Sequence, residues 1–261
     1  MTTVTEVTDR NPLGVPAHRH VNPDGSIGGW VAETAQVYGN AWVSGNAQVS
    51  GNARVSGNAR VSGNARVSGN ARVYGNALVY GNTWISGDAR VYGDAKVYGD
   101  AKVYGNTWVY GDAKVYGDAL VYGNAWVYGN AWVYGDTWVY GDARVYGDAR
   151  VYGDTWVYGD TWVSGNALVS EARHVASLGP VGSENRYVTC HRTVDGHLVV
   201  AGCWSGTLGE LAERIAAPAE AWGYGSEDDR ARWVADYEQA IEFFRPRVAE
   251  WDQHKREEMT K

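Results

Sequence analysis

One aliphatic residue returns every six positions from Val31 through Ile85 to Val169, and again at Val175, without an insertion. Between these positions the order hardly changes: Tyr or Ser, Gly, Asn or Asp, Ala or Thr, then one variable residue. Roughly two dozen copies follow one another. Repetition at a short fixed period is the sequence signature of a solenoid, so it constrains the fold more than any other feature.

A period of six fits one short strand and one bend per copy. In the copy Ala71-Arg72-Val73-Tyr74 alternate side chains point to opposite faces, so the Ala and the Val share the inner face. Gly75 then supplies a corner, because glycine adopts positive φ without steric cost. Three such sides close a triangular coil of about eighteen residues, and about eight coils stack at the strand spacing of roughly 4.8 Å.

Other repeat architectures fit less well. A helix needs apolar residues three and four positions apart, and a glycine in every sixth place would cost it about 1 kcal/mol each time. The calcium-binding roll repeats every nine residues, and collagen needs glycine at every third position. The pattern therefore predicts a mainly β protein built as a triangular solenoid.

The order aliphatic, x, Gly, Asn or Asp, small, x resembles the hexapeptide repeat of left-handed parallel β-helices. The resemblance covers more than half of the chain and implies a left-handed coil. It also implies an acyltransferase as one alternative function, since that family is best known for trimeric enzymes with a histidine near a coil and a loop protruding between coils. No loop interrupts residues 31–169, and no histidine lies there. His174 is the one candidate base near the coils, and the three histidines of hexapeptide-type carbonic anhydrases have no counterpart on them.

Three segments are predicted. Residues 1–26 form an arm or lid over the open solenoid end, residues 27–176 form the solenoid, and residues 177–261 form a small α+β cap. We expect the lid because an uncovered end exposes unpaired strand edges. His18 and His20 fit a solvated arm better than a metal site.

The cap sequence predicts a hairpin followed by two helices. Residues 186–193 and 198–203 alternate around Asp195-Gly196, a hairpin turn signal. Residues 207–210 and 226–229 read as helix starts, and Pro246 is expected to kink or break the second helix. Residues 179–183 are rich in Gly and Pro and predict a linker. Residues 202–208 resemble the tail of uncharacterised hexapeptide-repeat proteins of actinobacteria and their phages, which have no assigned activity.

Charge and composition narrow the function classes. The net charge is −7 and no basic patch argues for nucleic acid. The solenoid is near neutral, which argues against a DNA mimic. No apolar run is long enough for a membrane span, and no signal-peptide core is present, so a cytoplasmic chain is the default expectation, with a virion or cell surface as the alternative.

The outward positions change along the chain. The early coils carry Ser and Arg, and the later ones carry Tyr and Trp. Two interpretations stay open: the aromatic columns stabilise their own sheets, or they contact a sugar ring, a lipid headgroup region or a partner protein. The candidate binding residues are Trp84, Trp108, Trp126, Trp132, Trp138, Trp156, Trp162, Tyr140 and Tyr158.

One corner stacks Asp100, Asp118, Asp136 and Asp154. Basic residues nearby are expected to offset their repulsion, and one carboxylate per coil makes a poor cation cage. Ice binding is disfavoured because Thr occupies only inward positions of the repeats, such as Thr83.

Cys190 and Cys203 fall diagonally on the predicted hairpin, so a disulfide is conceivable, but buried and unreactive thiols are expected. We therefore predict a non-enzymatic scaffold or binding protein without cofactor or metal, presenting an aromatic surface, in a phage or cell-surface assembly. A glycan or a protein is the expected partner, with self-association through the C-terminal helix or a solenoid end. The alternatives are a hexapeptide acyltransferase and a carbohydrate-binding module.

Overall fold

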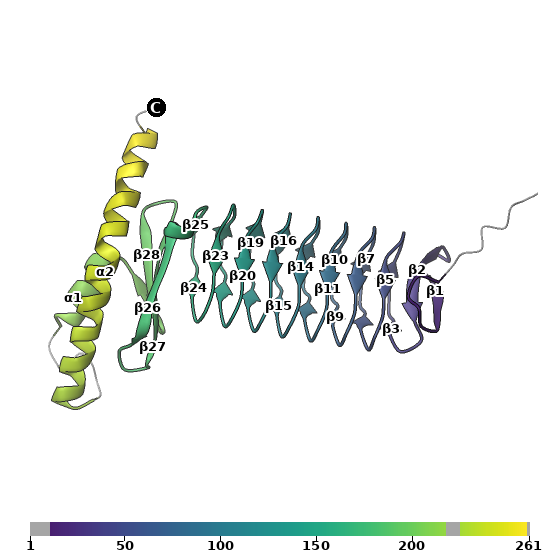
Figure 1. Ribbon diagram of the computed structural model, residues 1–261, viewed down its shortest axis with the longest axis horizontal. Helices are drawn as coiled ribbons and strands as arrows, with labels where there is room; N and C mark the ends of the chain where they lie inside the picture. The colour runs from purple at the N-terminus through teal and green to yellow at the C-terminus, as the bar shows by residue number, and fades with distance from the viewer. Residues whose placement is uncertain (1–10, 218–224, 260–261) are drawn as a thin grey trace, which may run out of the picture.

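The computed structural model describes residues 11–217 and 225–259 and shows a straight parallel β-solenoid closed at one end by a small α+β unit (Figure 1). Strands eighteen residues apart pair in parallel, as in Val79 with Val97, so each coil holds three copies of the repeat. The three sides of the coils form three sheets, which confirms the predicted parallel β-solenoid of about eight turns. The handedness stays an expectation from the resemblance.

Sheet A has nine strands, in the order β1-β2-β5-β8-β11-β14-β17-β20-β23. Its strands are β1 (Ala17–Val21), β2 (Ile27–Ala32), β5 (Gln48–Val49), β8 (Arg66–Val67), β11 (Trp84–Ile85), β14 (Lys102–Val103), β17 (Leu120–Val121), β20 (Trp138–Val139) and β23 (Trp156–Val157).

Sheets B and C have eight strands each and run from one end of the solenoid to the other. Sheet B contains β3 (Gln36–Val37), β6 (Arg54–Val55), β9 (Arg72–Val73), β12 (Arg90–Val91), β15 (Trp108–Val109), β18 (Trp126–Val127), β21 (Arg144–Val145) and β24 (Trp162–Val163). Sheet C contains β4 (Trp42–Val43), β7 (Arg60–Val61), β10 (Leu78–Val79), β13 (Lys96–Val97), β16 (Lys114–Tyr116), β19 (Trp132–Tyr134), β22 (Arg150–Val151) and β25 (Leu168–Val169).

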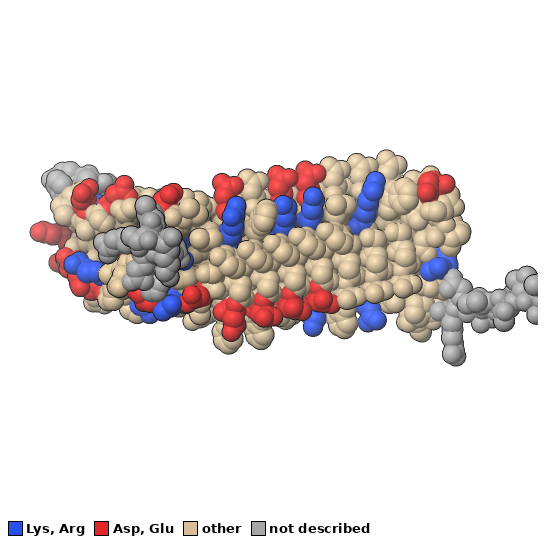
Figure 2. Space-filling view, turned by 90° about the horizontal axis from the view of Figure 1, so that it is seen from above, with Lys and Arg blue, Asp and Glu red and all other residues tan. Residues whose placement is uncertain are grey.

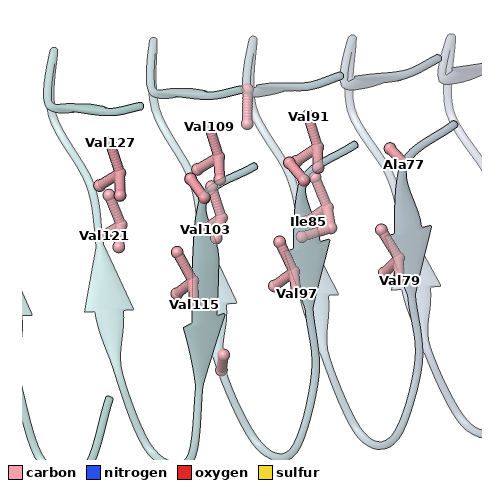
Figure 3. Close-up of a cluster of buried hydrophobic side chains, with 14 of the residues drawn as sticks. Ala77, Val79, Ile85, Val91, Val97, Val103, Val109, Val115, Val121 and Val127 are labelled. Atoms are coloured by element: carbon pink, nitrogen blue, oxygen red, sulfur yellow. The ribbon is translucent and has the colours of Figure 1, made fainter. Parts of the chain in front are cut away.

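The interior is a column of Val and Ala with Ile85 in one rung, and nearly all of these side chains are fully buried. Figure 3 shows the labelled valines of successive coils pointing into this shaft. Thr replaces Ala at Thr83, Thr107, Thr137, Thr155 and Thr161, all buried as expected. The hydroxyls of the last three donate to the carbonyl three residues earlier, so the polar group is satisfied without widening the coil.

The corners from Gly39 to Gly165 each turn at a glycine with positive φ, as at Gly69 (φ 65°). A Cβ there would lie 2.9 Å from the backbone N of Gly87 in the next coil. The corner therefore needs glycine for two reasons: its backbone has positive φ, and the next coil lies too close for a side chain.

The segment before the coils turns back on the solenoid. Strand β1 pairs antiparallel with β2, and the Asn22 side-chain oxygen accepts a hydrogen bond from the Val43 N–H at 3.0 Å. Both contacts cover strand edges at this end. Residues 1–10 of the predicted arm lie outside the described residues.

The cap unit is a four-stranded antiparallel sheet with two helices. The sheet contains β26 (Val175–Val181), β27 (Arg186–Arg192), β28 (His197–Ala201) and β29 (Trp204–Gly206), preceded by the 3-10 helix η1 (Ala172–His174). The predicted hairpin is confirmed as β27 and β28. The predicted linker is wrong in part, because residues 175–181 pair with β27 despite Gly179 and Pro180.

Helix α1 (Leu208–Ile215) begins at the predicted Thr207–Glu210 capping box. Helix α2 (Glu227–Met259) packs on β26 and β27 with an apolar stripe that includes Ala240, Phe244 and Trp251. Pro246 was expected to kink or break this helix, and a break is wrong, since the helix continues through that residue. Packing of the stripe on both sides of the proline holds the helix together, and Figure 1 shows it lying across the end of the solenoid. No helix in the described part of the chain combines the length and apolarity that a membrane crossing needs.

Candidate functional site

The tyrosines of the later coils form three stacked ladders, one beside each sheet. Neighbouring rings are nearly parallel, with centroids 4.8 Å apart for Tyr74 and Tyr92 and 5.5 Å apart for Tyr140 and Tyr158. Partial burial raises the pKa of most of these phenols, and that of Tyr128 rises to about 12, helped by Tyr146 and Tyr110 on either side. The members are Tyr74, Tyr92, Tyr110, Tyr128 and Tyr146; Tyr80, Tyr98, Tyr116, Tyr134 and Tyr152; and Tyr104, Tyr122, Tyr140 and Tyr158.

Sheet B carries a continuous stack of cations and indoles. The rings of Trp108 and Trp126 stack at 5.0 Å, and Arg90 covers the outer face of Trp108 at 4.7 Å. Arg144 lies between Trp126 and Trp162, at 5.0 and 4.5 Å from their centroids. These three indoles are half-buried, so their faces are occupied by neighbours in the same sheet.

Sheet C repeats this arrangement around one indole. The Lys114 ammonium lies 4.0 Å from the centroid of Trp132, and the Arg150 guanidinium lies 5.4 Å from it on the next coil. Trp132 is also half-buried. Its ring is therefore enclosed by cations rather than offered to a ligand.

Sheet A differs, because three of its indoles remain exposed. Trp84 is 49% exposed between Arg66 and Lys102. Trp138 and Trp156 stack at 5.4 Å with an interplanar angle of 13° and are 38% and 48% exposed. Beside them Tyr158 is 57% exposed at the end of its ladder.

The nine predicted binding residues thus lie on three different faces of the prism. Five of them are half-buried: Trp108, Trp126 and Trp162 on sheet B, Trp132 on sheet C, and Tyr140 in the ladder of sheet A. The four exposed ones belong to sheet A, and three of those gather at its C-terminal end. We call Trp138, Trp156 and Tyr158 the sheet A platform.

Sequence reasoning missed a groove beside this platform. It has a volume of about 650 Å³ and lies between the last strand of sheet A and the first strand of the cap unit. Its lining residues are Asp154, Trp156, Tyr158, Gly159, Thr161, Ala172, Val175, Ala176, Ser177 and Tyr187. The one signal for it in the sequence is the loss of the repeat pattern after Val169.

The corners also change along the solenoid. In the early coils each Asn amide donates to the residue one coil on, as Asn64 does to Asn82 at 2.9 Å. The ladder reaches Asp100, which accepts from Asn82 at 2.9 Å, and the three following corners in that column are Asp. Figure 2 shows rows of acidic side chains on the half nearer the cap unit. No group of three His, Cys, Asp or Glu side chains suited to a metal ion occurs in residues 11–217 and 225–259.

His174, the one candidate base near the coils, is buried at the junction with the cap unit. Its Nδ1 lies 3.1 Å from the Ser170 hydroxyl, and its ring meets the edge of Trp251 at 6.4 Å. The side chain does not line the groove beside the platform. Its contacts tie the last coil to helix α2.

The two cysteines are free thiols in different environments. Cys190 is buried, as predicted, and burial raises the pKa of its thiol to about 12. Cys203 is exposed, so the expectation that both are buried was wrong for it. The two thiols differ because Cys203 lies outside the hydrogen-bonded strands of the cap sheet, in the turn between β28 and β29.

A second cavity of about 420 Å³ lies within the cap unit, between its sheet and helix α1. Tyr187, Trp204 and Tyr237 supply aromatic walls, and Arg186 and Arg214 supply charge. It shares only Tyr187 with the groove.

These coils define the molecule as a parallel β-solenoid repeat protein. The family model described as the YdcK beta-solenoid repeat matches seven segments of the coils. They are residues 35–51, 47–63, 59–73, 71–87, 113–129, 125–141 and 143–159. No curated protein and no solved structure matches the chain. The matched segments all lie in the coils and include Trp138 and Trp156.

Proposed function

We propose that this chain is a non-enzymatic rod that holds an aromatic binding platform at one end of sheet A. The ligand class is a flat, partly apolar ring such as the face of a sugar. The single observation that carries the proposal is the stacked and exposed pair Trp138 and Trp156, with Tyr158 beside it.

The contrast with the other sheets supports a specific role for this pair. On sheet B, Arg90 and Arg144 cover the two outer faces of the Trp108–Trp126 stack. On sheet C, Lys114 and Arg150 flank Trp132. Neighbouring cations are absent from the described contacts of Trp138 and Trp156, so this pair contributes less to its own sheet and offers more surface to a ligand.

A rigid rod also suits presentation of a binding surface. The shaft is filled along its whole length by buried Val and Ala, and each coil hydrogen-bonds to the next. The distance between the two ends is therefore fixed by the number of repeats. In the sequence between Val31 and Val169 no histidine is available as a general base, which supports a role without catalysis.

A glycan array tests the proposal. We expect the full chain to bind a subset of glycans and the double variant Trp138→Ala/Trp156→Ala to lose roughly tenfold or more in affinity, because two stacking partners are removed. The matched control is Trp108→Ala/Trp126→Ala, which removes an equal pair from sheet B and should leave glycan affinity unchanged.

Two results would contradict the proposal. If the chain bound no glycan, or if both double variants lost glycan affinity equally, the sheet A platform would not be the glycan-binding site. Saturable binding of an acyl-CoA that is lost in His174→Ala would instead favour the acyltransferase alternative.

A further inference from the structure

The last coil supplies the final strand of all three sheets at the cap end: β23 to sheet A, β24 to sheet B and β25 to sheet C. The next strand of sheet A would fall near residues 174–175, but the chain there forms η1 and then enters the cap sheet as β26. The chain therefore adds no further strand to the edge of sheet A, although Val175 packs against the end of the core.

The other two sheets have their last N–H groups closed by side chains. On sheet B the Trp162 N–H donates to the Thr189 hydroxyl at 3.3 Å, and the Ser164 N–H donates to His191 Nε2 at 3.4 Å. Beside sheet C the Ser170 N–H donates to His174 Nδ1 at 3.3 Å. The cap unit thus protects two of the three edges.

The edge of sheet A has no such closure. One coil earlier, the N–H groups of Trp138 and Tyr140 donate to the Thr155 and Val157 carbonyls at 2.8 and 2.9 Å. The equivalent N–H groups of Trp156 and Tyr158 donate to no acceptor among the described residues. An edge strand with free donors is a template for pairing with another extended segment.

The groove of about 650 Å³ lies along this edge. A Cβ built on Gly159 would meet no atom within 4 Å, whereas one on Gly141 would lie 2.9 Å from the N of Gly159 in the next coil. Val175 and Ala176 provide apolar surface at the inner side of the groove, and Trp156 and Tyr158 line its outer side. The groove thus offers a strand both hydrogen-bond donors and places for alternate side chains.

We propose that residues 2–8 of a second copy of this chain fill the groove as an added strand of sheet A. Residues 5–8 read Thr-Glu-Val-Thr, and residues 155–158 of the edge strand read Thr-Trp-Val-Tyr. Residues 2–5 read Thr-Thr-Val-Thr and repeat the same order. A strand in this register places Val and Thr inward against Val175 and leaves the variable residues outside.

The same chain cannot supply this strand. In sheet A seven strand steps separate β2 from β23, about 34 Å at the usual strand spacing. Strand β1 lies at the far end of the solenoid (Figure 1), and the six residues from Thr5 to Asn11 span at most about 22 Å. The segment therefore reaches only the groove of another molecule.

The resulting contact joins the cap end of one rod to the opposite end of the next. Such a head-to-tail interface uses two different surfaces, so it builds a ring or an open chain of molecules rather than a closed pair. This inference goes beyond glycan binding and does not depend on it.

Sedimentation velocity of the full chain over a range of concentrations tests the proposal. We expect the weight-average mass to rise with concentration above that of one chain. Deleting residues 2–8 should hold the protein at the mass of one chain. A fluorescent peptide of residues 1–11 should then bind the truncated protein, as measured by anisotropy.

Two variants of Tyr158 test whether the edge strand β23 binds the peptide. In Tyr158→Pro the free N–H is removed and the ring projects into the groove, while the hydrogen bonds between β20 and β23 keep their donors and acceptors. We expect peptide affinity to fall roughly tenfold or more in this variant. Tyr158→Ala keeps the N–H and should bind the peptide within about threefold of the truncated parent.

Circular dichroism of both variants shows whether the solenoid is intact, and a double variant Val4→Asp/Val7→Asp offers a second test away from the groove. It should stay at the mass of one chain without a change in the circular dichroism spectrum. The proposal is overturned by a constant mass of one chain at all concentrations together with no peptide binding, or by self-association that survives the deletion.

Discussion

The early and late coils of this solenoid have the same interior and different exteriors. Val55 and Val127 are equally buried, and their coils turn at glycines with the same conformation. Outside, the early coils carry Arg and Ser with Asn ladders at the corners, and the late coils carry stacked Tyr and Trp with Asp at many corners. One backbone therefore accepts two ways of tying coil to coil. Amide hydrogen bonds predominate in the early half, and aromatic stacking predominates in the late half, where Asn106, Asn124 and Asn130 still donate to the next coil.

This difference separates the interior residues, which hold the fold in both halves, from the outer residues, which vary between them. The amide ladder of the early half ends where Asp replaces Asn, since a carboxylate accepts hydrogen bonds but has none to donate. The tyrosine ladders begin in the same region, at Tyr74 and Tyr80. We infer that aromatic stacking offsets the hydrogen bonds that the corners lose where Asp replaces Asn. Both halves depend equally on the buried Val and Ala of the interior.

The largest expected effect is that of a charge in the shaft. Val55→Asp and Val127→Asp should each cost several kcal/mol, because an unpaired carboxylate would be buried among apolar side chains. Thermal unfolding followed by circular dichroism measures this. The losses should be similar in the two halves. A much smaller loss for Val55→Asp would mean that the early coils are not part of one cooperative unit.

The second effect is a pH dependence that comes from the cap unit and not from either half of the coils. Burial lowers the pKa of His191 to about 4, well below the 6.5 that is usual for a histidine. The unfolded chain therefore takes up a proton at higher pH than the folded one. The associated stability is complete above about pH 6.5 and is lost as the pH falls toward 4, by about 3 kcal/mol in total.

Urea unfolding between pH 4 and pH 7 checks this prediction, with His191→Gln as the control that has no titrating ring. The parent should lose stability on acidification, and the variant should lose clearly less. An identical pH profile for both proteins would assign the dependence to another group.

The smallest expected effect compares equivalent positions of sheet B. Trp126 stacks on Trp108 and under Arg144, so Trp126→Ala should destabilise the protein by about 1–2 kcal/mol. Arg54 is exposed in an early coil, so Arg54→Ala should change stability by less than about 0.5 kcal/mol. Equal urea midpoints for the two variants would show that the aromatic ladders do not stabilise their sheets.

Most of the fold follows from the sequence, and less of the site does. The period of six predicts the three columns of outward residues, which the structure confirms from Trp30 to Leu168. The same period does not predict which indoles stay exposed, because Trp126 and Trp138 have the same place in the repeat. Arg144 lies over the ring of Trp126, whereas no described cation lies over Trp138, and that difference comes from neighbours on the adjacent coils.

The cap unit shows the same limit. The turn at Asp195-Gly196 and the capping box at Thr207 are local signals, and both were read correctly. Strand β26 was missed because its Gly179 and Pro180 are typical of a loop. Pairing with β27 and packing against helix α2 override that local preference.

The sequence by itself determined the shaft, the corners and the order of the outward columns, because each depends on residues within one repeat or one coil. Only the tertiary structure decided that Trp138, Trp156 and Tyr158 form an exposed platform, and that the edge of β23 stays unpaired beside a groove. The first feature depends on which neighbours cover each indole, and the second depends on how the cap unit meets the last coil. No local pattern encodes either contact.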